Sequence, residues 1–419
     1  MRPDPTGGVV VLPTDKGLPA WAAGLTAGEL AQRHPDVRSG GFLFPLLTAD
    51  ESALAGNIAA MAGYARDHDV LLCPHGKTTM SPELVRRQLD AGAWGVTAAT
   101  ISQASTFRTF GMGRILLANE LVDPAGLDWA LAELDRDPGF EFLMYVDSAA
   151  GLTAVEAALA RRGPGRPVSL LVELGAPGGR TGCRTVDEAV GLARGVLRLP
   201  GARLAGVAGY EGVLGHTVHP ATVAMVRGYL AAVREVLDAV VALGTEEPGE
   251  LLVTAGGSTW FDLVLDELGP AVTGGRARLV LRSGCYVTHD HGLYAATTPA
   301  TRAAGPALAP ALRLWAQVLS VPEPGRAIVG FGRRDCSFDA GLPVPLERLA
   351  GDGQREPLDA VRVVDLNDQH AYLEHDGRLA VGDLLSLGIS HPCTSFDKWR
   401  LIPVLDDDEA VVGLLSTWF

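Results

Sequence analysis

One lysine in this sequence stands where it could form an imine with an aldehyde. Lys77 lies in residues 73–79 (CPHGKTT), which follow an apolar run at residues 70–73. A lysine at the mouth of a folded domain, partly removed from water, can supply the neutral amine that imine formation requires. A solvated surface lysine or a salt bridge at the rim would also explain it. Lys77 by itself therefore does not define a reaction.

The same segment looks like the end of a phosphate-binding P-loop. Gly76, Lys77 and Thr78 match the last three positions of that motif, which also needs a glycine five residues before Gly76. Position 71 is Leu71. The sequence therefore excludes a P-loop nucleotide hydrolase.

Two further segments could hold an anionic or phenolic ligand close to the backbone. Arg180 lies among the glycines of residues 175–182, where it offers a permanent cation for a phenolate or a carboxylate. Tyr210 follows another apolar run and offers a phenol as a hydrogen-bonding group. An ordinary glycine-rich turn and a packed tyrosine remain the simpler explanations.

Two Gly/Ser segments, residues 254–259 and 282–286, follow the seventh and eighth apolar runs of the chain. In β/α barrels the loops after strands seven and eight recurrently bind phosphate through backbone N–H groups. Together with Lys77, these segments predict a phosphorylated aldehyde cofactor, namely pyridoxal phosphate.

A histidine and a cysteine two residues apart form a candidate metal pair. His391 and Cys393 follow an apolar run, so that their side chains would project to the same face if the strand continued. Imidazole and thiolate select a borderline-soft ion, zinc first, and two protein ligands leave positions open for water or substrate. Two ordinary buried side chains are the alternative interpretation.

The elements that position these groups alternate between apolar runs and helical segments. The helical segments include residues 81–91, 152–161 and 221–243. Eight such runs predict a (β/α)₈ barrel, with an open doubly wound sheet as the competing fold. The eight runs are residues 70–73, 95–98, 114–118, 141–146, 168–173, 204–208, 251–255 and 279–281.

Beyond a Pro/Ala-rich passage at residues 298–310 the hydrophobic period becomes two, which predicts a second, mostly β domain. Its predicted strands are residues 312–321, 327–330, 360–366, 384–389 and 411–415. We expect a segment at residues 1–45 that completes the β domain, the barrel at 46–300, and the C-terminal β domain with the metal pair at 301–419.

Composition limits the partners and the compartment. With 35 Lys+Arg against 49 Asp+Glu, the net charge is −14, and the chain shows no Lys/Arg cluster, which argues against nucleic acid. Five scattered cysteines without a Cys-x-x-Cys pair indicate a reducing compartment. There is no apolar stretch of ~18 residues and no signal-peptide core, so we expect a cytoplasmic protein without a membrane partner.

The ordered set of motifs resembles the fold-type III pyridoxal phosphate enzymes of the D-serine dehydratase and D-threonine aldolase group. The resemblance covers nearly the whole chain. It rests on residues 74–78 (PHGKT), 180–182 (RTG), 210–212 (YEG), 256–258 (GGS), 284–286 (GCY) and 391–393 (HPC). It implies an alanine-racemase-like (β/α)₈ barrel with a β domain, working as a homodimer on a small-molecule D-amino acid.

The resemblance also implies a role for each matched residue. Lys77 would be the catalytic residue and the point of cofactor attachment, Arg180 would contact the phenolic oxygen, and Tyr210 would lie near the ring nitrogen. His391 and Cys393 would hold the metal, expected to be Zn²⁺. The phosphate would be surrounded by Thr254, Gly256, Gly257, Ser258, Gly284 and Cys285 or Tyr286.

The implied activity is that of a lyase on a D-β-hydroxy-α-amino acid. In the family, a cysteine in the metal pair accompanies dehydratases and an aspartate accompanies aldolases, so Cys393 favours β-elimination of the D-serine dehydratase type. Retro-aldol cleavage to glycine and an aldehyde is the alternative, and a racemase or a non-catalytic pyridoxal phosphate carrier is more remote. Many members have Lys-Thr-His-Lys where this chain has Lys77-Thr78-Thr79-Met80, so the substrate contacts of that loop do not carry over.

Overall fold

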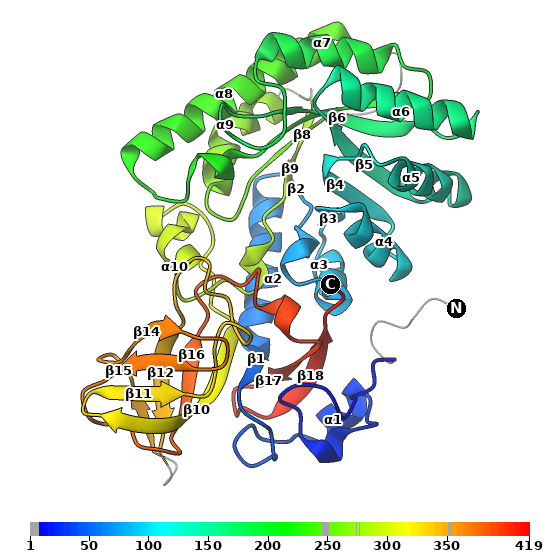
Figure 1. The fold of residues 1–419 in the computed structure, drawn as a ribbon. Coiled ribbons are helices and arrows are strands. Elements are labelled where there is room, and N and C mark those ends of the chain that lie inside the picture. The colour runs from blue at the N-terminus through cyan, green and yellow to red at the C-terminus, as the bar shows by residue number, and fades with distance from the viewer. Residues whose placement is uncertain (1–7, 245–250, 274, 276, 351–353) are drawn as a thin grey trace.

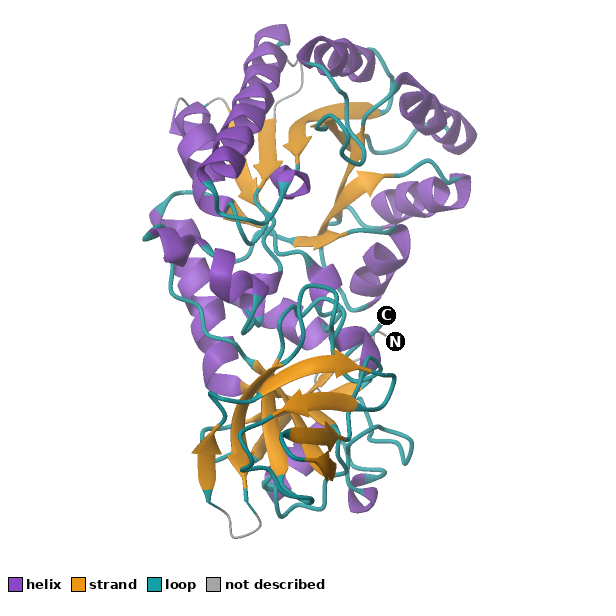
Figure 2. Ribbon diagram, turned by 60° about the vertical axis from the view of Figure 1, so that its left-hand side comes forward, coloured by secondary structure: helices purple, strands orange, loops and turns teal. Residues whose placement is uncertain are grey.

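The computed structural model contains two sheets, one in each half of the molecule (Figures 1 and 2). The structure describes residues 8–244, 251–273, 275, 277–350 and 354–419. Eight parallel strands form the upper sheet of Figure 1, and the lower sheet is mostly antiparallel.

All eight predicted barrel strands are confirmed. They pair in the order β2-β9-β8-β7-β6-β5-β4-β3. Most are buried along nearly their whole length, which explains why they read as continuous apolar runs rather than alternating ones. The strands are β2 (Leu71–Leu72), β3 (Val96–Ala98), β4 (Arg114–Glu120), β5 (Glu141–Val146), β6 (Val168–Leu174), β7 (Ala202–Gly209), β8 (Leu251–Ala255) and β9 (Ala277–Leu281).

The sheet closes on itself, which excludes the open doubly wound alternative. The two terminal strands, β2 and β3, come together through backbone hydrogen bonds: Trp94 N–H donates to the Leu72 carbonyl (2.7 Å) and Thr97 N–H to the Pro74 carbonyl (2.8 Å). The carboxyl ends of all eight strands therefore surround one opening.

Helices cover the outside of the barrel (Figure 2). Several begin at a side-chain cap that the sequence encodes. Asp50, Thr100, Asp123, Ser148 and Thr185 each accept a backbone N–H of the first turn. The helices are α2 (Glu51–Asp67), α3 (Pro82–Asp90), α4 (Ile101–Thr109), α5 (Pro124–Arg136), α6 (Ala149–Arg162), α7 (Val186–Leu197), α8 (Pro220–Leu243) and α9 (Phe261–Thr273).

The second sheet contains the five predicted strands of the β domain and four others that the pattern missed. The predicted ones are β10 (Leu312–Glu323), β11 (Arg326–Val329), β14 (Arg362–Leu366), β16 (Leu384–Gly388) and β18 (Val411–Ser416). The others are β12 (Val344–Leu349), β13 (Arg355–Pro357), β15 (Ala371–Glu374) and β17 (Leu401–Leu405). Three of these four contain a proline, a residue that argues against a strand in sequence analysis.

The N-terminal part of the chain packs on the second sheet. Strand β1 (Leu46–Asp50), which the expected barrel boundary at residue 46 included, instead pairs with β10 and β17. Val11, Leu18 and Leu30, the last from α1 (Ala27–Arg33), share a buried cluster with residues of that sheet, including Trp315. The other expected boundaries remain predictions.

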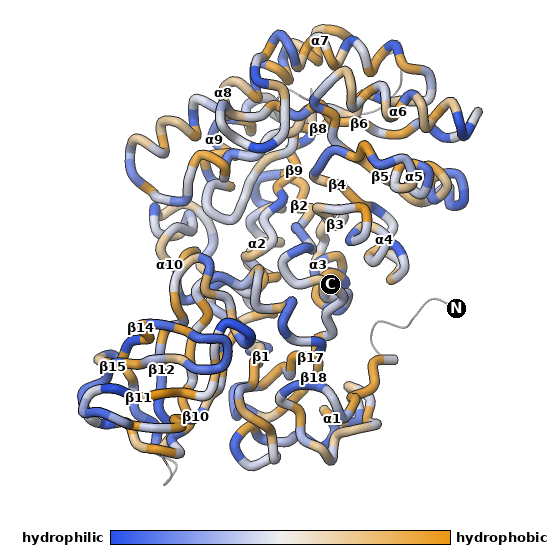
Figure 3. The backbone as a smooth tube through the Cα atoms, in the orientation of Figure 1, coloured by the Kyte–Doolittle hydropathy of each residue, from blue (hydrophilic) through white to orange (hydrophobic). Residues whose placement is uncertain are grey.

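Hydrophobic residues are concentrated in the strands, and the outer helices carry both hydrophilic and hydrophobic residues (Figure 3). Among the described helices, none combines the length and the apolar character needed to span a bilayer.

Candidate active site

A cavity of about 580 Å³ lies at the carboxyl ends of the barrel strands and is completed by loops of the second domain. It brings together ten of the twelve residues that the sequence singled out. These are Lys77, Arg180, Tyr210, Gly256, Gly257, Ser258, Gly284, Cys285, His391 and Cys393. The remaining two, Thr254 and Tyr286, do not line it.

Lys77 is held in a short 3₁₀ turn, η2 (Gly76–Thr78), just beyond β2. The turn requires glycine at position 76, because a Cβ there would come within 2.4 Å of the Phe107 ring. His75 lines the cavity beside the lysine. Burial, followed by the positive charges of Lys77 and Arg282, lowers the pKa of His75 well below its usual value. A neutral imidazole therefore accompanies the lysine.

Arg180 and Tyr210 lie face to face on another part of the wall. The guanidinium carbon of Arg180 is 4.7 Å from the centre of the Tyr210 ring, a cation–π contact. Burial and the nearby Glu211 raise the pKa of Tyr210 to about 12, although Arg180 opposes the shift. The phenol is therefore neutral at physiological pH and can donate or accept a hydrogen bond.

The two glycines that the sequence assigned to phosphate already bind a carboxylate. Gly257 N–H donates to Glu211 Oε1 (2.6 Å) and Gly256 N–H to Oε2 (3.1 Å). Glu211 is fully buried in the turn η3 (Glu211–Leu214). Gly256 and Gly257 therefore order this wall, while Ser258 and Gly284 also line the cavity.

The side chains of Thr254 and Tyr286, which were expected near the phosphate, are engaged in hydrogen bonds outside the cavity. The Thr254 hydroxyl lies below the cavity, where it donates to the Val280 carbonyl (2.9 Å) and accepts from Arg282 Nη1 (2.7 Å). The phenol of Tyr286 is buried and accepts from Gln88 of α3 (2.9 Å). Both side chains support the wall from behind.

Two sulfur atoms and an imidazole that could bind a metal ion meet at the boundary of the two domains. His391 and Cys393 are joined by Cys285, which the sequence assigned to the phosphate, and one ligand atom from each lies within 4.8 Å of the others. The two sulfurs are 3.3 Å apart. His391 Nδ1 is hydrogen-bonded to Asp339 Oδ2 at 2.9 Å, an orientation typical of metal-ligating histidines. This donor set fits a zinc ion.

The thiols and the imidazole share their protons. The hydrogen bond from Cys393, followed by those of His391, Tyr294 and Thr78, lowers the pKa of Cys285 well below its usual value despite burial. Burial lowers the pKa of His391, but the hydrogen bond with Cys285 and the Asp339 carboxylate outweigh it and raise that pKa to about 9. These shifts favour loss of a proton from Cys285 and its retention on His391, and a metal ion bound here would displace that proton.

Sequence reasoning missed several charged residues of the site. Arg282 lines the cavity and is 6 % exposed, and its Nη2 donates to the Gly209 carbonyl (2.7 Å). It follows β9 directly, a position that could have been recognised. Glu173, at the end of β6, lines the same wall. Asp339 lies in a loop far from His391 in sequence, and no pattern in the chain indicates their contact.

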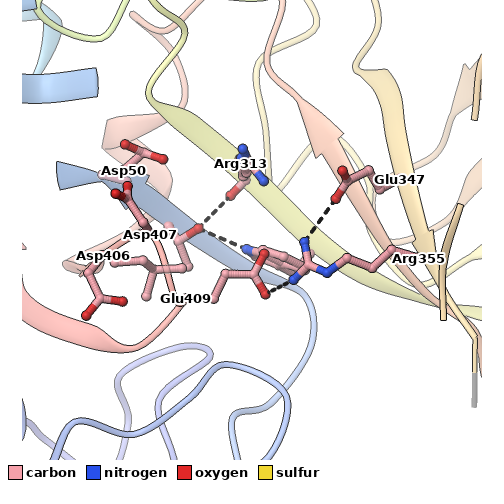
Figure 4. Close-up of a pocket in the computed structure, with 11 residues that line it drawn as sticks. Asp50, Arg313, Glu347, Arg355, Asp406, Asp407 and Glu409 are labelled. Atoms are coloured by element: carbon pink, nitrogen blue, oxygen red, sulfur yellow. Dashed lines mark hydrogen bonds and ion pairs between the residues drawn. The ribbon is translucent and has the colours of Figure 1, made fainter. Parts of the chain in front are cut away.

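A second, smaller cavity of about 230 Å³ lies on the antiparallel sheet (Figure 4). There, Arg355 is paired with Glu347 (3.2 Å) and with Glu409. The described residues that line it include no lysine, histidine or cysteine. Five acidic residues and two arginines line it, and we assign it no reaction.

A closed parallel barrel with a lysine at its mouth, followed by a β domain that completes the cavity, defines a fold-type III pyridoxal phosphate enzyme. The family "Alanine racemase, N-terminal domain" matches residues 49–261, and "Putative serine dehydratase domain" matches residues 311–405. The chain belongs to this family, in the group that contains the D-serine dehydratases and D-threonine aldolases.

The similar proteins include both aldolases and dehydratases. D-threonine aldolase of Arthrobacter sp. is 29% identical over 368 residues, 81% of this chain and 89% of the relative. D-threo-3-hydroxyaspartate dehydratase of Delftia sp. (strain HT23) is 33% identical over 169 residues, 40% of this chain and 43% of the relative. The crystal structure of D-threonine aldolase from Filomicrobium marinum superposes with a TM-score of 0.74 at 26% identity, covering 90% of this chain and 95% of that one.

Proposed function

We propose that this protein is a lyase that uses pyridoxal phosphate and a divalent metal to eliminate water from a D-β-hydroxy-α-amino acid, with D-serine as the simplest substrate. The unsaturated amine left by the loss of water would take up one water in turn and give a 2-oxo acid and ammonia. The observation that carries the proposal is that Lys77 and the soft ligands His391 and Cys393 line one cavity although they come from different domains. One small substrate can therefore touch both.

The residues of the cavity fit the cofactor. Lys77 would attach it, Arg180 and Tyr210 would contact its ring, and Ser258 and the Gly284 loop would receive its phosphate. Gly284 lets its loop pack closely against the segment that carries Lys77, because a Cβ there would lie 2.5 Å from the His75 carbonyl oxygen. When bound, pyridoxal phosphate supplies an electron sink for the electron pair left at Cα.

The chain's own groups then have separate tasks. The Nζ of Lys77, once released from the cofactor, would remove the Cα proton. Tyr210 is a neutral phenol, a weaker partner for a ring nitrogen than a carboxylate, so that expulsion of the hydroxyl needs its own activation. When bound, zinc supplies a Lewis acid for that leaving group. Asp339 would hold His391 in the orientation that the metal needs.

Retro-aldol cleavage is the second candidate, favoured by the relative named D-threonine aldolase and by His216. That reaction needs a base for the β-hydroxyl proton. His216 lines the cavity, and burial, followed by the charge of His391, lowers its pKa, so it stands ready as a neutral base.

The test is a product analysis of the purified protein with D-serine, D-threonine and D-threo-3-hydroxyaspartate, each against its L enantiomer. We expect equal amounts of ammonia and 2-oxo acid from the D forms. If the products are glycine and an aldehyde, without ammonia, the reaction is retro-aldol cleavage and the proposed elimination is wrong. Formation of the L amino acid would indicate a racemase, and no turnover of any substrate by protein loaded with cofactor and zinc would indicate a carrier. Lys77→Ala is the matched inactive control.

We further propose that the protein acts as a homodimer in the cytoplasm, without nucleic acid or membrane partners. Light scattering on a size-exclusion column measures the mass directly. Twice the chain mass of 43.9 kDa is expected, and a single chain mass at working concentration would contradict the dimer.

A further inference from the structure

The metal cluster contains a third potential ligand beside His391 and Cys393. Cys285 begins the turn η4 (Cys285–Val287), a few residues after barrel strand β9, whereas the other two follow β16 of the second domain. Its side chain is 5 % exposed, and its sulfur lies 3.3 Å from that of Cys393. Two elements distant in sequence thus bring two thiols and an imidazole to one point.

The spacing of these atoms suits a single tetrahedral ion. Zinc bonds of ~2.3 Å to sulfur place two sulfur ligands ~3.8 Å apart in a tetrahedron. The observed 3.3 Å is slightly shorter, and a small side-chain rotation closes the difference. One potential ligand atom from each of the three residues lies within 4.8 Å of the others, so all three can reach a common ion.

The surroundings point the ligands inward. Because His391 Nδ1 is bound to Asp339, its other ring nitrogen is left for the thiols. The Thr78 hydroxyl lies 3.6 Å from both sulfurs, where it can donate to a thiolate. Thr78 also follows Lys77 directly, so the cluster is joined to the turn that carries the proposed catalytic amine.

We propose that Cys285 is the third protein ligand of the metal, which makes a Cys₂His zinc site with one open position that fastens the barrel to the β domain. This inference rests on the metal-dependent function proposed above. Two thiolates and an imidazole select zinc over magnesium, calcium or manganese, which prefer oxygen ligands. The remaining position is the one a catalytic zinc needs for water or substrate.

The ligand count can be measured without any assay of activity. X-ray absorption of the zinc-loaded, cofactor-loaded protein should show two sulfur neighbours. The cobalt-substituted protein should show the visible spectrum of a tetrahedral ion. Its thiolate-to-cobalt charge-transfer band, measured as the difference from cobalt-free protein, should be about half as strong in Cys285→Ser as in the wild type. Zinc affinity, by competition with a chromogenic chelator, should fall more than about 100-fold, beyond the ~10–100-fold typical of losing an outer-shell partner.

Matched variants separate a ligand from a structural residue. Cys336→Ala removes a thiol that is also buried but lies in the second domain against the Gly332 carbonyl, so zinc binding should not change. Cys393→Ser and His391→Ala should lose zinc as Cys285→Ser does. Retained absorption of the bound cofactor in each variant shows that the barrel is folded.

Three outcomes would overturn the inference. One is a single sulfur neighbour in the wild-type protein. Another is Cys285→Ser that keeps the full charge-transfer band and binds zinc within about tenfold of wild type. The third is a Cys285–Cys393 disulfide, detected by mass spectrometry without reductant, in protein that takes up no metal. If zinc binds through both thiols but D-β-hydroxy amino acids are not turned over, the proposed function fails while the ligand assignment stands.

Discussion

Glu211 holds the loop of Gly256 and Gly257 at the wall of the cavity. The loss of loop stability on replacing Glu211 by glutamine can be worked out from its hydrogen bonds. The fully buried carboxylate accepts N–H groups from Gly256 and Gly257, at 3.1 and 2.6 Å. In Glu211→Gln the amide oxygen keeps one of these bonds as a neutral one, and the NH₂ group faces the other N–H. The second glycine is then a buried donor without an acceptor.

The expected cost is the sum of these two changes. Exchanging a charge-assisted hydrogen bond for a neutral one costs about 1 kcal/mol, and a buried unsatisfied donor costs about 1–3 kcal/mol. The total of about 2–4 kcal/mol corresponds to a roughly 30–1,000-fold larger equilibrium constant for opening of the loop, and to hydrogen exchange that is faster by the same factor. Hydrogen exchange followed by mass spectrometry of peptides containing Gly256 and Gly257 measures this opening locally.

Glu188 offers a control because it also accepts two backbone N–H groups, those of Arg184 and Thr185, but both at Oε2 and at the exposed start of α7. In Glu188→Gln the amide oxygen can take the place of Oε2 and water can reach both donors, so the exchange of its two partners should change less than about tenfold. Unchanged exchange at Gly256 and Gly257 in Glu211→Gln would refute the reasoning, because other groups would then hold the loop.

Three further changes test other parts of the molecule. Lys77→Ala should abolish covalent attachment of pyridoxal phosphate, measured by mass spectrometry after borohydride reduction; label on another peptide would contradict the assignment. Asp339→Asn should weaken zinc binding about tenfold by chelator competition, near the lower end of outer-shell effects because this carboxylate is 45% exposed; an unchanged affinity would reject its positioning role. Burial, followed by the charge of Glu173, raises the pKa of Glu120 from 4.5 to about 8. Between these two pH values the folded protein holds a proton that the unfolded chain has released. The free energy of unfolding therefore falls as the pH rises from 4.5 to about 8. Glu120→Gln should flatten the loss of Tm between pH 5 and pH 8 in thermal scans, and an equal slope in both proteins would contradict that pKa.

The barrel strands could be predicted because their signal is local. Both faces of such strands are buried, so each appears as a short apolar run with a polar end, and the residues after these runs, such as Lys77 and Tyr210, belong to one rim by the geometry of parallel strands. The strands β12 and β17 could not be predicted, since Pro345 and Pro403 interrupt their pattern and their pairing partners are distant.

The residue types and their spacing were enough to indicate which kinds of chemistry are available, namely an amine, an arginine with a phenol, glycine-rich loops and a soft metal pair. How these groups are combined depends on the packing of the folded chain. In the folded chain the sulfur of Cys285 lies beside that of Cys393, and Asp339 is hydrogen-bonded to His391. The N–H groups of Gly256 and Gly257 donate to Glu211. These contacts join segments separated by 45 to 108 residues. The direction of a side chain across such a distance depends on how whole elements pack, and no local spacing encodes it.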